Sequence, residues 1–116
     1  MAEPVTGHRP WGSYTILDEA ADYKVKRIEV LPGRRLSLQR HRRRSEHWYF
    51  VRGHGTVRLG DRELAAAPGV AADIPAGTLH RVGCEGSTPL VFIEIQRGDY
   101  FGEDDIERLE DDFGRA

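Results

Sequence analysis

The sequence predicts an all-β domain, either a sandwich or a barrel, followed by one short C-terminal helix. Two observations favour β-structure. Short apolar or alternating runs recur along the chain, and most of the 13 glycines and 6 prolines fall between them as turn signals. Many short strands separated by regular turns are typical of sandwiches and barrels. A third observation, helical spacing near the C-terminus, predicts the single helix.

The chain of 116 residues suits one domain. We expect an N-terminal arm over 1–12, a barrel over 13–98, and a C-terminal tail with its helix over 99–116. The expected strands, in order, are residues 13–17, 23–31, 35–41, 47–52, 56–59, 70–74, 80–82 and 90–96. Gly60 and Asp61 separate two short runs and predict a tight hairpin turn.

The expected helix covers 103–112. Ile106, Leu109 and Phe113 follow one another at i, i+3 and i+7, which places them on one face of a helix. Acidic residues at 103–105 would lie in the first turn, where they suit the helix dipole. Gly114 is a natural end for the helix.

Composition narrows the class of protein. The chain is 39% hydrophobic and 31% charged, with a net charge of -2. A nucleic-acid-binding domain is more often strongly basic, so we expect no nucleic-acid partner. Cys84 is the single cysteine, which excludes an internal disulfide and fits a reducing compartment. We find no signal-peptide pattern and no apolar run of about 20 residues, so we expect a cytoplasmic protein without a membrane partner.

The stretch LQRHRRRSEHWYF, residues 38–50, can be a basic patch for a polyanion or one wall of a metal site. Side chains alternate between the two faces of a strand. Gln39 and His41 would therefore share one face, while Arg40 and Arg42 would share the other and face solvent. Alternation thus favours the metal site.

Two further residues complete the candidate metal site. Glu46 follows a predicted turn and can return opposite His41, and His80 follows a second turn at 75–77. Imidazole, carboxylate and amide oxygen all bind divalent cations. The candidate ligands are Gln39, His41, Glu46 and His80.

The spacing of these residues resembles the two signature motifs of the cupin superfamily, which has a small jelly-roll β-barrel fold. Residues 33–53 read G-x5-Q-x-H-x4-E-x6-G, and residues 69–80 read G-x5-P-x-G-x2-H. Gln39 stands where the first histidine usually is, which argues against a three-histidine oxygenase site. Cys84 stands where an asparagine often ends the second motif.

Further segments narrow the resemblance to one subfamily. RPWGSY, YKVKRIEVLPG, IPAGTLHR and residues 93–115 are similar to the C-terminal cupin domain of type II phosphomannose isomerases. That domain usually follows a mannose-1-phosphate guanylyltransferase domain. We expect no guanylyltransferase activity, because 116 residues leave no room for that second domain.

The resemblance implies a metal-dependent interconversion of mannose 6-phosphate and fructose 6-phosphate through an enediol-type intermediate. The metal would polarise the sugar oxygens as a Lewis acid. Zinc is the expected cofactor, because it suits imidazole and carboxylate ligands and no redox step is needed; cobalt, manganese, nickel and iron are alternatives. A sugar phosphate is the expected small-molecule partner, and by analogy the protein is expected to be a homodimer.

Glu94 and Gln96 share one face of the apolar run LVFIEIQ, which indicates a wet interior on that side. Glu94 is the candidate general base and His47 the second choice. Alternatively, Glu94 is a buried carboxylate paired with a lysine. The resemblance also implies that cationic residues bind the phosphate of the substrate. The expected catalytic residues are Glu94, Arg115 and Lys24, and the expected substrate-binding residues are Lys26, Arg44, Gln96 and Trp11.

Four functions are therefore open. The first is a stand-alone mannose-6-phosphate isomerase, an aldose–ketose isomerase, which is the expectation carried forward. The second is a non-catalytic metal-binding cupin that binds a sugar phosphate or a nucleotide sugar. The third is another cupin enzyme, and the fourth is a nucleic-acid module that uses the arginine run.

Overall fold

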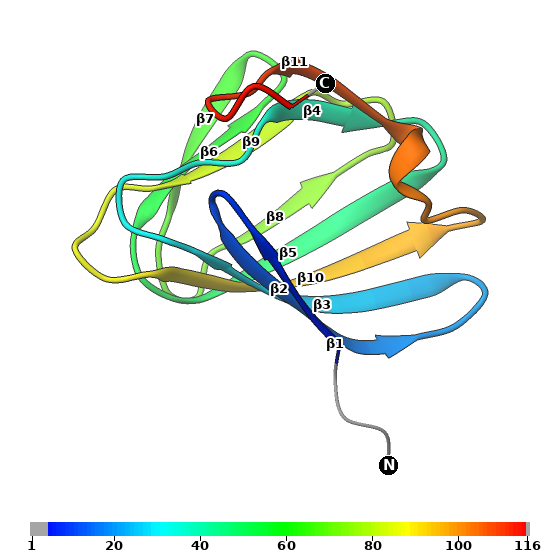
Figure 1. Cartoon of the computed structure of the whole chain (residues 1–116), viewed down its shortest axis with the longest axis horizontal. Helices are drawn as coiled ribbons and strands as arrows, with labels where there is room; N and C mark the ends of the chain where they lie inside the picture. Colours follow the sequence, from blue (N-terminus) through cyan, green and yellow to red (C-terminus); the bar gives the residue numbers. More distant parts are fainter. Residues whose placement is uncertain (1–4, 116) are drawn as a thin grey trace.

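The computed structural model describes residues 5–115 as two antiparallel β-sheets packed face to face (Figure 1). The six-stranded sheet has the order β1 (Val5–Arg9), β2 (Gly12–Glu19), β3 (Tyr23–Val30), β10 (Leu90–Gly98), β5 (Arg44–Arg52) and β8 (Ala71–Ile74). The five-stranded sheet has the order β11 (Ile106–Glu110), β4 (Leu38–His41), β9 (His80–Cys84), β6 (Gly55–Leu59) and β7 (Arg62–Ala66). The predicted all-β class is confirmed.

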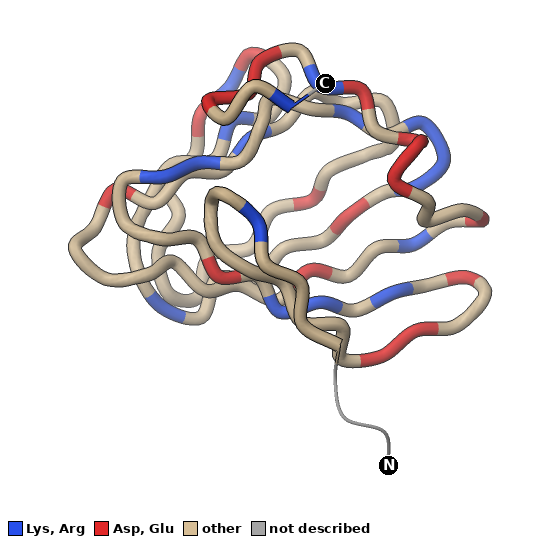
Figure 2. Tube along the Cα trace, in the orientation of Figure 1, with Lys and Arg blue, Asp and Glu red and all other residues tan. Residues whose placement is uncertain are grey.

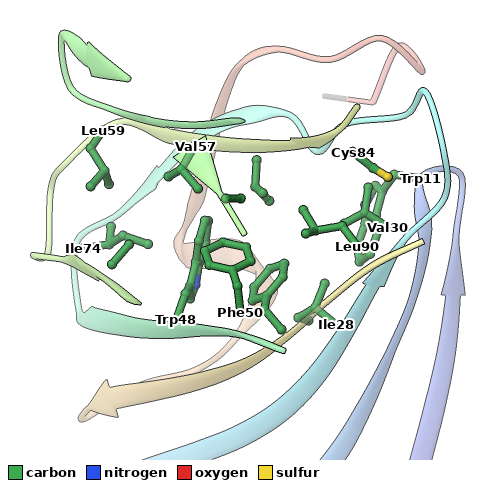
Figure 3. Packing of buried hydrophobic residues seen from close by; sticks show 14 residues of the cluster. Trp11, Ile28, Val30, Trp48, Phe50, Val57, Leu59, Ile74, Cys84 and Leu90 are labelled. Carbon is green, nitrogen blue, oxygen red and sulfur yellow. The ribbon is translucent and has the colours of Figure 1, made fainter. Parts of the chain in front are cut away.

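An apolar core fills one end of the space between the sheets (Figure 3). It forms because alternate residues of each strand point inward and are apolar there. Trp48 and Phe50 from β5 pack against Phe92 from β10, with ring centroids 4.9 Å and 5.0 Å from that of Phe92. The inward positions of β10 change from apolar to polar at Glu94, so the other end of the same space is a polar cavity.

The predicted hairpin at Gly60 is present. Leu59 pairs with Arg62, which leaves Gly60 and Asp61 as the two turn residues between β6 and β7. Gly60 has a φ of +59°, a value that glycine adopts without steric cost.

The predicted C-terminal helix is wrong. Residues Glu103–Asp105 form one 3-10 turn, and the chain then continues as β11, which pairs with β4. Leu109 and Phe113 are 48% and 37% exposed, so the expected apolar stripe has no core to cover. The segment forms a strand rather than a helix because pairing with the open edge of β4 satisfies backbone groups along that edge.

Charged contacts attach this C-terminal segment to β4 and to the turn that follows it. The Asp105 carboxylate accepts hydrogen bonds from the backbone N–H groups of Arg42 and Arg43. Arg40 donates two hydrogen bonds to Glu107. Figure 2 shows the acidic segment beside the basic turn. The arginine run therefore serves mainly to hold the tail of the chain.

Residues 5–9 of the expected N-terminal arm form β1, which pairs along its whole length with β2. Residues 1–4 and 116 lie outside the described range. No helix within residues 5–115 has the length and apolar character that crossing a membrane requires.

Candidate metal centre and cavity

Three of the candidate ligands converge from three strands. His41 ends β4, Glu46 lies near the start of β5 and His80 begins β9. All three are buried, and each offers a ligand atom that lies within 4.8 Å of the others. Strand alternation turns Glu46 and His41 inward, and the short turn between β4 and β5 brings them together. Two imidazoles and one carboxylate at this separation suit a divalent metal such as zinc.

Gln39, the fourth candidate ligand, pairs with His80 across β4 and β9. It is 9% exposed and lines the same cavity as the three ligands. Its position therefore allows its side chain to reach the centre, and its role as a ligand stays a prediction.

The two histidines are in the protonation state that metal binding needs. Burial, assisted by the nearby Arg44 cation, lowers the pKa of His41 to about 3. Burial also lowers the pKa of His80. The imidazoles are therefore neutral near pH 7, and only neutral imidazole binds a metal.

Hydrogen bonds around the histidines also fit a metal. His80 Nδ1 lies 2.9 Å from the Thr78 carbonyl oxygen, so Nδ1 carries the proton and the Nε2 lone pair faces Glu46. His41 Nδ1 is buried and has no hydrogen-bond partner, and it lies 3.6 Å from Glu46 Oε2. A cation bound at His41 Nδ1 would give this buried atom the partner that it lacks. Because a neutral imidazole has a single nitrogen lone pair, Nε2 would then carry the proton and the Arg44 contact to Nε2 would have to shift.

Arg44 borders this centre directly. Its Nε donates to Glu46 Oε2 over 3.0 Å, and its Nη2 donates to His41 Nε2 over 2.9 Å. Arg44 is itself buried and lines the cavity. The guanidinium therefore orients both ligand side chains and balances the negative charge of Glu46.

A second carboxyl lies beside the centre on β10. Trp48 Nε1 donates to Glu46 Oε1 over 3.0 Å and to Glu94 Oε1 over 3.1 Å, and Gln96 Nε2 donates to Glu94 Oε2. Burial and the neighbouring Glu46 raise the pKa of Glu94 to about 8. Glu94 therefore carries a proton near pH 7, which does not favour the expected role as a general base. Lys26 is its cross-strand partner, yet no ion pair forms between them.

This pKa predicts how stability changes with pH. In protein stripped of divalent metal, the free energy of unfolding should fall as the pH rises from about 7 to about 8. In this window the folded protein keeps the Glu94 proton, whose pKa is about 8, while the unfolded chain, with a pKa near 4.5, has lost it. The slope should stay below the one-proton limit of about 1.4 kcal/mol per pH unit, because the unfolded histidines still bind some protons at pH 7 and Glu94 begins to ionise toward pH 8.

Urea denaturation at a series of pH values measures this slope, and the Glu94→Gln variant is the control. It should lose the fall in stability, because residue 94 can no longer titrate. His41 and His80, whose pKa values are lowered in the folded protein, add an opposing rise near pH 6.5 that fades toward pH 8, so the difference between wild type and Glu94→Gln isolates the Glu94 contribution. A wild-type stability that is flat or rises with pH would contradict the prediction.

The cavity brings together most of the predicted substrate residues. Its wall includes, from that set, Trp11, Lys26, Arg44, Glu94, Gln96 and Arg115. Lys24 does not line it: its amine pairs with Glu19 of β2 at 3.7 Å. His47 points to the outer face of the sheet, where its Nδ1 lies 2.6 Å from Asp73.

Sequence reasoning missed several residues of the same wall, among them Arg9, Tyr14, Ser37 and Arg108. Ser37 had a signal, because it lies two residues before Gln39 and so shares its face. The others depend on how β1, β2 and β11 fold over the cavity, which no local pattern reveals.

Known structures support the fold class. The chain matches the capsular polysaccharide assembling protein CapF from Staphylococcus aureus with a TM-score of 0.83 and 22% identity, over 95% of this chain and 35% of that one. It matches an oxalate decarboxylase from Lactobacillus farciminis with a TM-score of 0.78 and 23% identity, over 91% of this chain and 33% of that one. The fold, with a candidate metal centre inside it, defines a cupin.

The family model described as "Mannose-6-phosphate isomerase C-terminal" matches residues 2–111, and the chain belongs to this family. The resemblance drawn from the motifs is confirmed.

Curated relatives are longer proteins. The chain is 47% identical over 109 residues to the alginate biosynthesis protein AlgA of Pseudomonas aeruginosa, which is 94% of this chain and 23% of that protein. It is 42% identical over 102 residues to the mannose-1-phosphate guanylyltransferase RfbM of Salmonella typhimurium, covering 88% of this chain and 21% of that protein. The chain thus spans less than a quarter of either relative and is related to enzymes.

These relatives correct one expectation. The predicted function, a stand-alone mannose-6-phosphate isomerase, is wrong, because the relatives are named for alginate or xanthan biosynthesis or as mannose-1-phosphate guanylyltransferases. The part that they share with this chain is a C-terminal domain rather than a whole enzyme. The non-catalytic alternative fits these findings better.

Proposed function

We propose that this cupin domain is a metal-dependent binding module for phosphorylated sugars and does not turn them over. The observation that carries the proposal is the buried cluster of His41, Glu46 and His80 at a cavity whose wall also holds several cations. A metal at the cluster would attract the oxygens of a sugar, and the cations would attract its phosphate. Zinc is the proposed metal, because the donor set is imidazole and carboxylate.

The electrostatics of the cavity also support binding rather than proton abstraction. Glu94, which shares the Trp48 Nε1 donor with Glu46, is protonated near neutral pH in the metal-free protein and is hydrogen-bonded to Gln96. A protonated carboxyl donates a hydrogen bond to a ligand but does not take a proton from it. Because the histidines are neutral, the positive charge that a ligand meets comes from the bound metal and the cationic wall.

Calorimetry combined with a coupled isomerase assay tests this function. We expect one zinc ion per chain and binding of mannose 6-phosphate to the zinc-loaded protein. Removal of the zinc by a chelator should weaken sugar-phosphate binding at least about tenfold, which is about 1.4 kcal/mol. Fructose 6-phosphate should not appear. Turnover, or an absence of sugar-phosphate binding to zinc-loaded protein, would contradict the proposal.

The cellular location and the oligomeric state are also proposals. We propose a cytoplasmic location, which the free, buried Cys84 supports, because a reducing compartment keeps thiols unpaired. We also retain the homodimer expected by analogy, and no nucleic-acid or membrane partner is proposed.

A further inference from the structure

Two cations lie over one aromatic ring in the cavity wall. The Lys26 Nζ atom is 4.7 Å from the centroid of the Tyr14 ring, and the Arg9 Cζ atom is 4.9 Å from it. Lys26 belongs to β3, Tyr14 to β2 and Arg9 to the end of β1. All three residues line the cavity that contains the metal cluster. We call Arg9 and Lys26 together the Tyr14 cation pair.

The ring is held in place by its surroundings. Arg9 Nη2 donates to the Tyr14 hydroxyl over 3.3 Å, and Nη1 donates to the His8 carbonyl oxygen over 2.9 Å. Gly7 leaves room for the ring, because a Cβ at this position would overlap the Tyr14 side chain. The two cations are therefore positioned by the fold of the N-terminal hairpin.

Within residues 5–115, no carboxylate lies at ion-pair distance from Arg9 or Lys26, although Lys26 is only 8% exposed. A buried charge is costly unless it is paired, and cation–π contacts offset only about 0.5–2 kcal/mol of that cost. Two like charges beside one ring add repulsion, so an anion in the cavity that both residues line would be stabilised.

Two further polar groups are available in the same cavity. Ser37 Oγ and Gln96 Oε1 are buried and have no hydrogen-bond partner, and both residues are 1% exposed. Buried polar groups almost always have partners in folded proteins. The Ser37 hydroxyl can donate to an anion, and Gln96 Oε1 can accept from a sugar hydroxyl. These unsatisfied groups point independently to a polar ligand.

We propose that the Tyr14 cation pair is the phosphate subsite of this cavity and selects sugar monophosphates over neutral sugars. This inference rests on the proposed function, and it assigns the binding of the phosphate to Arg9 and Lys26. Two cations match the double negative charge of a phosphate monoester better than the single charge of a sugar carboxylate. The sugar hydroxyls then face the metal cluster from the far end of the ligand.

Titration calorimetry of the zinc-loaded protein tests the subsite with mannose 6-phosphate, mannose 1-phosphate, mannose and glucuronate. Arg9→Gln and Lys26→Gln should each weaken binding of the sugar phosphates by about 10- to 100-fold, as loss of a charged hydrogen bond does. Arg27→Gln is the matched control, because Arg27 is next to Lys26 on β3 but exposed on the opposite face. It should bind like the wild type.

The outcomes separate this inference from the proposed function. If the wild type binds sugar phosphates and both variants bind them equally well, the subsite is wrong while the proposed function stands. If the zinc-loaded wild type binds neither phosphate, the proposed function fails and the subsite fails with it. Glucuronate binding as tight as phosphate binding would overturn the selectivity. Arg9 is exposed, so Arg9→Gln keeps the test valid even if Lys26→Gln lowers the melting temperature.

Discussion

Replacing His80 with alanine is expected to weaken zinc binding by more than about 100-fold. Loss of a residue that only supports a metal ligand typically costs 10- to 100-fold, and a direct ligand should cost at least as much. His80 presents Nε2 toward Glu46, and the Thr78 carbonyl fixes its orientation through Nδ1. No other histidine among residues 5–115 joins this cluster, apart from His41. Competition with a chromophoric chelator measures the affinity.

His47→Ala is the matched control for this experiment. His47 is adjacent to Glu46 on β5 but points to the opposite face, where it pairs with Asp73. It should bind zinc as the wild type does, and its folding should be unchanged within about 0.5 kcal/mol, as for most surface substitutions. Equal zinc affinity in His80→Ala and the wild type would show that zinc does not bind at the proposed centre.

The same face alternation explains which parts of the site were predictable from sequence. Gln39 and His41 were expected on the inner face and Arg40 on the outer one, and their burial follows that order. Glu94 and Gln96 were likewise expected to face inward, and both are buried. These predictions depend only on the two-residue period of a strand and on the burial of one face.

Contacts between neighbouring strands were not predictable in this way. The C-terminal segment has helical spacing, but pairing with the open edge of β4 makes a strand more stable there, and the Asp105 carboxylate binds the turn after β4. Lys24 is two residues from Lys26 and therefore lies on the same face of the strand, yet its amine pairs with Glu19 on the neighbouring strand. Arg9 meets Tyr14 only after β1 folds onto β2. Each outcome depends on which residues face one another across paired strands, and the strand period carries no information about that pairing.

Trp48 joins the apolar core to the metal centre, so Trp48→Ala should have the largest effect on stability. The side chain is 2% exposed and packs on Phe92 on one side and on the His80 ring, at a centroid distance of 5.6 Å, on the other. Removing a buried aromatic side chain typically costs about 3–5 kcal/mol. That is a large share of the 5–15 kcal/mol typical of a domain. Urea denaturation of metal-free protein measures the loss.

Trp48→Phe separates packing from hydrogen bonding. Phenylalanine keeps most of the apolar surface but removes the Nε1 donor that lies between Glu46 and Glu94. Two buried carboxyl groups then lose a shared partner, which should cost about 1–3 kcal/mol of stability. Glu46 also loses a group that orients it, so zinc affinity should fall by about 10-fold or more.

The matched comparison is Phe50→Leu, which changes the same strand two residues further into the core. Phe50 is fully buried and has no polar atom, so this variant should lose stability through packing alone. Its zinc affinity should equal that of the wild type. If Trp48→Phe also binds zinc like the wild type, the indole N–H has no part in positioning Glu46. A zinc loss confined to Trp48→Phe would instead mean that this N–H, rather than general core packing, holds the ligand carboxylate in place.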